Sequence, residues 1–251
     1  TSYTVTPDAS GNWSIPVAKF DGVTGMTGMF WFCPFLTAMD LSNFDTSSVT
    51  DMSQMFSGCS KLTTLDLSGW NTSSVTGMSQ MFTACISLTS LDVRHFNTSS
   101  VTDMNSMFEN CRSLKTLDVS HFNTGRVSNM GNMFYGCTNL TSLDLSHFNT
   151  SNVKKMYGMF ADCGSLTSLD LSGWNTSSVT DMNNMFNKCR SLTSLDLSHF
   201  SIGRVSKMSN MFFGCTSLTT IKMVGCSEAT INKIKAQLAT DGITSCTIVT
   251  E

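Results

Sequence analysis

The chain has 251 residues, a formal net charge of −3 and a charged fraction of 13%, roughly half the usual share. Without a cluster of lysines and arginines, a nucleic-acid partner is not expected. No stretch of about 18 apolar residues is present, so neither a membrane span nor direct membrane insertion is expected. Residues 1–13 are polar and do not resemble the apolar core of a secretory signal.

At the amino end, Trp13 and Ile15 precede Met39 and Leu41 by one 26-residue period of the repeat described below. Residues 23–33 also follow the spacing of the segments one period later, whereas the first half of this unit is degenerate. A terminal coil must shield an otherwise open apolar face. We therefore predict that residues 1–35 form an N-terminal cap with a degenerate first coil.

From residue 36 a leucine-rich motif recurs with a 26-residue period. A representative repeat sequence is that of residues 62–85, LTTLDLSGWNTSSVTGMSQMFTAC. The period is marked by Leu36, Leu62, Leu88, Leu114, Leu140, Leu166, Leu192 and Leu218. A fixed period of this length is typical of a solenoid, in which each coil buries its apolar side against its neighbours. The sequence thus predicts an α/β leucine-rich-repeat solenoid over residues 36–221, with about eight 26-residue coils plus caps.

Each unit divides into two halves. Leu62, Leu65 and Leu67 match a strand with its leucines turned inward, and successive strands are expected to stack in parallel on one face. Residues 75–85 place Val, Met, Met, Phe and Cys at helical spacing, which predicts a short helix on the other face, capped by Thr76. Left-handed backbone is expected to end that helix at Ala84 and its equivalents.

Several residue types form columns, one member per unit. The paired methionines are interpreted as core, with a soft-metal site or a pliable recognition surface as alternatives. The Phe/Trp column that begins at Phe44 and Trp70 is also interpreted as core, with a sugar-stacking platform as the alternative. The Asp/Asn column of Asp45 and Asn71 is expected to satisfy turn backbone. A threonine column that includes Thr72 raises the further alternative of ice binding.

Eight of the ten cysteines form a column of their own and are interpreted as small buried thiols. They are Cys33, Cys59, Cys85, Cys111, Cys137, Cys163, Cys189 and Cys215. Residues 222–251 depart from the repeat and predict a C-terminal cap, with a helix over 227–238 that has Ser227 as its N-cap, and a strand over 243–249. Cys226 and Cys246 flank that helix, and a disulfide between them is expected to fasten the cap.

Residues 140–163, LTSLDLSHFNTSNVKKMYGMFADC, resemble the repeat of BspA-like bacterial surface proteins, and the resemblance covers about residues 23–221. It implies an extracellular module at the bacterial cell surface. The implied partner is a host matrix protein, a mucin-type glycoprotein or another cell-surface ligand. The signal, lipid-attachment cysteine and sorting motif of full-length members do not occur in this chain, so extracellular localisation is expected on the resemblance alone.

Outward-facing strand residues provide the candidate ligand-binding surface, expected to be concave. It comprises Asp66, Asp92, Arg94, Asp118, Asp144, Asp170 and Asp196, with His95, His121 and His147 on its flank. A file of carboxylates favours protonation unless hydroxyls or cations stabilise the charge. The aspartates could accept structural hydrogen bonds from Ser and Thr, or they could bind Ca²⁺. A zinc site at the histidines is the less favoured alternative.

No catalytic motif stands apart from the repeat, so the chain is not expected to be an enzyme, and neither a cofactor nor a metal is predicted. The favoured interpretation is a monomeric recognition or adhesion module that binds along the repeat surface. The alternative is a structural spacer, a stiff rod that presents other domains.

Overall fold

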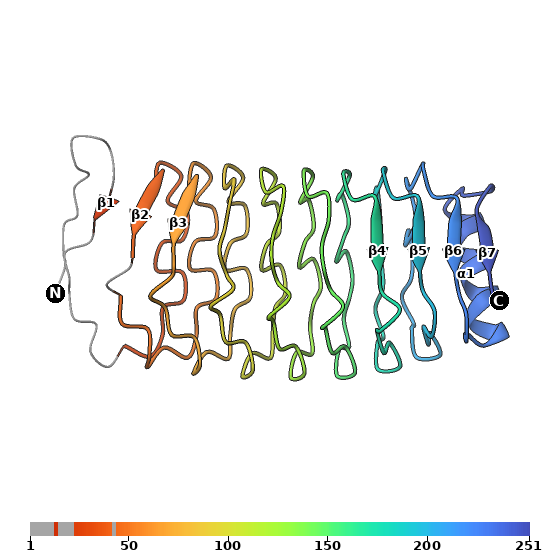
Figure 1. The fold of residues 1–251 in the computed structure, drawn as a ribbon, viewed down its shortest axis with the longest axis horizontal. Coiled ribbons are helices and arrows are strands. Elements are labelled where there is room, and N and C mark those ends of the chain that lie inside the picture. Colours follow the sequence, from red (N-terminus) through yellow and green to blue (C-terminus); the bar gives the residue numbers. More distant parts are fainter. Residues whose placement is uncertain (1–12, 15–22, 42–43) are drawn as a thin grey trace.

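The computed structural model describes residues 13–14, 23–41 and 44–251. In this part of the chain, successive coils stack side by side along an almost straight axis (Figure 1). The predicted solenoid-like repeat fold of parallel stacked segments is therefore confirmed. Since this view shows no horseshoe curvature, we call the surface formed by residues 64–66 and their equivalents the strand face rather than a concave face.

Two short parallel sheets form the strand side. The first contains β1 (Trp13–Ser14), β2 (Ala38–Asp40) and β3 (Thr64–Asp66). The second contains β4 (Ser168–Asp170), β5 (Ser194–Asp196), β6 (Thr220–Lys222) and β7 (Thr247–Val249). Leu65 pairs with Met39 and Leu195 with Leu169, so the register equals the 26-residue period. The equivalent segments between β3 and β4 are not strands, and the expected continuous sheet is thus interrupted.

The opposite side of each coil contains turns where helices were predicted, and that prediction is wrong. The N–H groups of Met52, Gln54 and Phe56 donate to carbonyls of the next coil, at Gly77, Ser79 and Met81. These bonds join different coils, whereas the hydrogen bonds of an α-helix join residues of one coil. Seven parallel bridges, from Gly25–Asp51 to Asp181–Lys207, continue this pattern. We call residues 51–58 and their equivalents the turn ladder.

Backbone conformation explains why the turn ladder is not helical. Within one coil, Met55 N–H donates to the Met52 carbonyl (3.3 Å) and Cys59 N–H to the Phe56 carbonyl (3.1 Å). The third residue of each turn has a positive φ, 60° at Gln54 and 80° at Gly58, as a type II turn requires. Two such turns in succession place apolar residues at spacings of three and four, which the sequence alone does not distinguish from a helix. Thr76 accordingly caps no helix.

The core lies between the two sides of each coil. Phe30, Phe56 and their equivalents to Phe212 stack in one file, with neighbouring ring centroids 5.4–5.9 Å apart. Every methionine of the two columns is buried except Met29, which is 37% exposed. The Phe/Trp column is buried as well, from Phe44 to Phe200. Both core interpretations are confirmed for the described residues, and the sugar-stacking platform is wrong.

Buried threonines fasten the loops that join the two sides. Thr98 Oγ1 donates to the Asn123 carbonyl of the next coil (3.0 Å) and accepts from the Asn123 N–H (2.7 Å). The threonines of this column are about 1% exposed, so an ice-binding row is wrong. Ile202 replaces threonine in the last coil, where the corresponding carbonyl, that of Ser227, accepts from the Ile231 N–H of the terminal helix instead.

The C-terminal cap contains the only α-helix of the described residues, α1 (Glu228–Thr240). Ser227 Oγ accepts from the Thr230 N–H (3.2 Å), which confirms the predicted N-cap. Asp241, just beyond the helix, is 7% exposed and accepts from the Phe212 N–H (2.8 Å). This carboxylate therefore takes the place of the carbonyl that a further coil would supply. The described residues include no helix long and apolar enough to cross a membrane.

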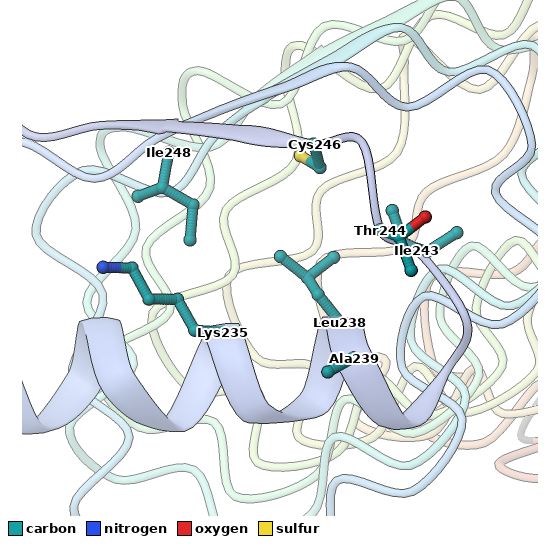
Figure 2. A pocket seen from close by; sticks show the side chains of 7 residues that line it. All are labelled: Lys235, Leu238, Ala239, Ile243, Thr244, Cys246 and Ile248. Carbon is teal, nitrogen blue, oxygen red and sulfur yellow. The ribbon is translucent and has the colours of Figure 1, made fainter.

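The predicted disulfide is wrong, because Cys226 and Cys246 are separate thiols. Cys226 follows Phe200 by one period, in phase with the Phe/Trp column, and its Sγ donates to the Leu197 carbonyl (3.3 Å). Cys246 instead lines an open hollow of about 560 Å³ between α1 and β7, opposite Leu238 (Figure 2). The repeat register, rather than the helix between them, determines where each thiol points.

Candidate functional site

The aspartates of the strand face occupy one position in successive coils. Asp66, Asp92, Asp118, Asp144 and Asp170 are exposed, whereas Asp196 is half-buried. The register of β4 and β5 pairs Asp170 directly with Asp196. Each of these residues follows an inward-facing leucine, and the alternation of a strand therefore turns its carboxylate toward solvent. The structure thus brings the predicted carboxylates together as a file.

Each carboxylate is fixed by a turn at the end of its strand segment. Asp118 Oδ1 accepts from the Ser120 N–H (3.1 Å) and from the Ser120 hydroxyl (2.7 Å). Asp144 makes the same two bonds with Ser146, at 3.0 and 2.7 Å. This is the Asx turn, in which a side chain replaces a backbone acceptor. The structural hydrogen-bonding interpretation of the column is confirmed at these positions.

These bonds favour the ionised carboxylates. The Ser120 hydroxyl and N–H lower the pKa of Asp118 below its ordinary value, and the Ser146 N–H and hydroxyl lower the pKa of Asp144. Burial raises the pKa of Asp196, but Ser198 and Lys222 outweigh it, and the net pKa is lowered. The exception stated for the file therefore applies to these three groups: hydroxyl and N–H donors, and Lys222 at Asp196, stabilise the ionised carboxylates.

Cations interrupt the acidic file at two places. Arg94 Nε and a terminal guanidinium nitrogen contact the two oxygens of Asp92 at 3.0 and 2.7 Å. The guanidinium holds the pKa of Asp92 well below its usual range. Lys222 Nζ lies 3.3 Å from Asp196 Oδ2. Both pairs are solvent-accessible and contribute little to stability, so their main effect is to vary the charge pattern of the face.

The three predicted histidines, His95, His121 and His147, are exposed on adjacent coils, each shortly after an aspartate of the file. Across the described part of the chain, no three His, Cys, Asp or Glu residues converge on a point that could hold a metal ion. A repeat distributes like residues along an axis, whereas a metal site needs its ligands around one centre. The zinc alternative thus has no geometric support here.

The sequence analysis missed a second acidic column, on the turn ladder. Asp51 Oδ1 accepts from the Ser53 N–H (2.8 Å), Asp103 Oδ1 from the Asn105 N–H (2.8 Å) and Asp181 Oδ1 from the Asn183 N–H (3.1 Å). Asn129 makes the equivalent bond in its coil. The sequence does contain a signal for these turns, because an Asp or Asn recurs at the 26-residue period two residues before the N–H donor of each turn. We did not recognise it because the segment was assigned to a helix.

The Asp/Asn column predicted to satisfy turn backbone does so. Asp45 accepts from the Ser47 N–H (2.9 Å) and Asn71 from the Ser73 N–H (3.0 Å). A coil can thus contain three Asx turns, as at Asp92, Asn97 and Asp103, although Gly77 and Lys155 occupy the third position in other coils. Their repetition shows that most polar columns stabilise the turns of the coil, so a ligand on these columns would be bound by the atoms that the turns leave available.

The column cysteines are not candidate nucleophiles. Cys111 Sγ donates to the Phe82 carbonyl (3.2 Å) and Cys137 Sγ to the Phe108 carbonyl (3.2 Å). Burial raises the pKa of Cys137 to about 12, and only a thiolate is strongly nucleophilic. These cysteines lie beside the inter-coil bonds of the turn ladder, and each of these two thiols donates to a carbonyl of the preceding coil.

Comparison with known proteins places the chain in a family. The family model described as "Mycoplasma protein of unknown function, DUF285" matches residues 9–116, 86–168 and 112–224. The chain belongs to this family. Among solved structures, "Crystal structure of TLR13-ssRNA13 complex" is 15% identical, with a TM-score of 0.19 over 80% of this chain and 45% of that one. The chain thus spans less than half of that protein's length. No curated protein matches.

Proposed function

We propose that this chain is an extracellular recognition module of a bacterial cell surface, which binds a host matrix protein, a mucin-type glycoprotein or another cell-surface ligand along the strand face. The proposal rests mainly on the file of ionised, hydrogen-bonded carboxylates. The resemblance of the repeat to BspA-like surface proteins supports the location and the class of partner. The module is proposed to act as a monomer without enzymatic activity, metal or cofactor.

The geometry of the carboxylates favours binding because little freedom is lost. Asp118 and Asp144 use Oδ1 for both turn bonds, so each side chain is already held in one orientation. Oδ2 of each remains available to a cationic group or a hydroxyl of a ligand. Groups fixed before binding lose less conformational entropy than mobile ones. Coils in register repeat this acceptor along the face, which suits an extended ligand.

A spacer is the second candidate, and one observation favours it. Inter-coil bridges run without interruption from Gly25 to Lys207, so the body is braced along its length. A rod needs only this continuity and no ligand. The two functions are separated by asking whether any partner binds saturably.

The experiment begins with arrays of matrix proteins and mucin-type glycoproteins, followed by titration of each hit. The double variant Asp118→Asn/Asp144→Asn removes two charges and keeps the acceptor oxygen of each turn. We expect affinity for the hit to fall at least about thirtyfold, because the two fixed charges at an interface contribute on the order of 1 kcal/mol each or more. Asp118→Lys/Asp144→Lys should weaken binding further.

The matched control is Asp103→Asn/Asp181→Asn, which makes the same chemical change in Asx turns of the turn ladder. It should bind as the unaltered chain does. Equal losses in both double variants would remove the strand face as the binding surface. Saturable binding to no component of either array would favour the spacer.

A further inference from the structure

A polar hollow of about 240 Å³ opens on the turn ladder. Its wall includes Tyr135 and Tyr157, two of only three tyrosines in the chain. They lie on adjacent coils. Other coils carry small residues such as Ser53 and Asn105 at the Tyr157 position, whereas the Tyr135 position is variable and includes Ser57, Trp31 and Phe213. The hollow therefore lies where the repeat departs from its own pattern, which is unusual in a body built from copied columns.

Tyr157 is held in place by two earlier members of its own column. A Cβ added to Gly131 would overlap Tyr157 Cζ, so the ring occupies space that exists only because residue 131 is glycine. The Tyr157 hydroxyl accepts from Asn105 Nδ2 (2.8 Å), two coils away. Asn105 Nδ2 also donates to the Gly131 carbonyl (2.7 Å). Three consecutive coils thus cooperate to fix one ring.

The neighbouring Gly158 keeps the hollow open. Its φ is +58°, and a Cβ there would overlap Asn132 Oδ1. A side chain at this position would therefore displace the Asn132 amide, which also lines the hollow. Gly158 thus lines the hollow itself, whereas Gly131 makes room for the Tyr157 ring in its wall.

The charged groups of the wall balance one another. Asp162 Oδ2 and Lys188 Nζ lie 3.9 Å apart, longer than a firm hydrogen bond, and both side chains are partly exposed. Asp162 also faces Tyr135, whose pKa is raised by burial and by this carboxylate. With one charge of each sign, the hollow favours a neutral ligand over an ion. Lysine supplies donors, the carboxylate accepts, and the amide of Asn187 does both.

We propose that this hollow binds one neutral sugar unit, with the sugar ring against the tyrosine wall and its hydroxyls on Asp162, Lys188 and Asn187. A sugar combines an apolar ring face with hydroxyls that both donate and accept, which matches this wall. The volume lies below the roughly 300–1,000 Å³ of sites for drug-sized ligands, so a single unit fits. The site uses other columns than the strand face and does not depend on the function proposed for that face.

The test measures binding of the methyl glycosides of glucose, galactose, mannose and N-acetylglucosamine by calorimetry and by saturation-transfer NMR. We expect saturable binding of at least one glycoside, with a Kd on the order of 1 mM. Asp162→Gly should weaken that binding at least about tenfold, as loss of a charged hydrogen-bond partner implies. The variant should fold, because residue 162 has a φ of 57° and Gly58, Gly136 and Gly214 occupy its column.

Asn110→Gly is the matched control, since residue 110 has the same column and a φ of 57° but does not line the hollow. It should bind the glycoside as the unaltered chain does, and Tyr135→Ser, which restores the residue of Ser57, should lose binding. Asp118→Lys/Asp144→Lys on the strand face should leave sugar binding intact. Absence of glycoside binding, equal affinity in Asp162→Gly and Asn110→Gly, or preference for inorganic phosphate would each overturn the proposal.

Discussion

The two sides of each coil differ in how they join their neighbours. The turn ladder has inter-coil bridges throughout the stack, from Gly25 to Lys207. The strand side has regular pairing only near the two ends, and residues 67–167 contain no strand. Side-chain burial differs less: Met133 on the turn side is fully buried, the strand-side leucines such as Leu91 are also in the core, and Leu143 alone of its described column is only partly buried.

This contrast shows that the strand consensus is not the main brace of the molecule. Turn residues with positive φ present alternate N–H groups to the next coil, and the phenylalanine file packs directly behind them. The strand side is left with exposed polar columns and fewer inter-coil bonds. These exposed columns are the surface on which the proposed recognition function depends.

The largest expected effect comes from deleting similar side chains on the two sides. Met133→Ala should lower the free energy of unfolding by about 2–5 kcal/mol, because it leaves a cavity in a closed part of the core. Leu143→Ala should cost less than about 2 kcal/mol, since the residue is already partly exposed. Urea unfolding of both variants measures the difference. Equal losses would contradict the unequal bracing of the two sides.

A smaller effect is expected in the loops that connect the two sides. Thr98→Val keeps the shape of the side chain but leaves the N–H and carbonyl of Asn123 without their partner. We expect a loss of about 1–3 kcal/mol in unfolding free energy. Thr102→Val is the control, because Thr102 is exposed and its bond to the Thr76 carbonyl is 3.5 Å long. If both variants lose equally, the buried threonines do not fasten the loops.

The smallest effect is expected on the strand face, as a dependence of stability on pH. The pKa values of Asp118 and Asp144 are lowered by hydrogen bonds in the folded chain. The unfolded chain therefore binds more protons as the pH falls, and stability is lost below the ordinary aspartate pKa of about 3.9. Asp118→Asn/Asp144→Asn should flatten this loss in urea unfolding curves measured between about pH 5 and 2.

Added salt serves as the control for that experiment. Hydrogen bonds within each turn are the main cause of the lowered pKa values, so the slope should persist at high ionic strength, where long-range charge interactions are screened. A slope that disappears with salt would assign the effect to the file as a whole and not to the individual turns.

The sequence was sufficient for the features that depend on the period. It predicted the solenoid, the parallel register of Leu65, the buried methionine and aromatic columns, and the capping of α1 by Ser227. It also placed left-handed backbone at Ala84 and Asn110, though as helix ends. It failed for the turn ladder, because paired turns and a short helix bury residues at the same spacing. It failed for Cys226 and Cys246, because the register of each segment with the preceding coil, rather than the helix between them, determines where each thiol points.

For the candidate sites, the sequence identified the strand-face columns but not the sugar hollow. The hollow depends on Asn105, Gly131 and Tyr157, which are distant in the sequence and meet only through the stacking of three coils. The sequence of a single repeat does not reveal such a combination, because Asn105, Gly131 and Tyr157 belong to three different repeats and each substitution is ordinary on its own.

The sequence by itself determined the stacking register of this protein, since a strict 26-residue period dictates which residues of neighbouring coils contact one another. What only the tertiary structure decided is how the backbone of each coil satisfies its hydrogen bonds. N–H groups can find a carbonyl within one coil or in the next, and burial patterns are the same in both cases. The choice between helix and turn ladder therefore depends on the neighbouring coil, which supplies carbonyls at 2.8–3.0 Å from the N–H groups of Met52, Gln54, Phe56 and Gly58.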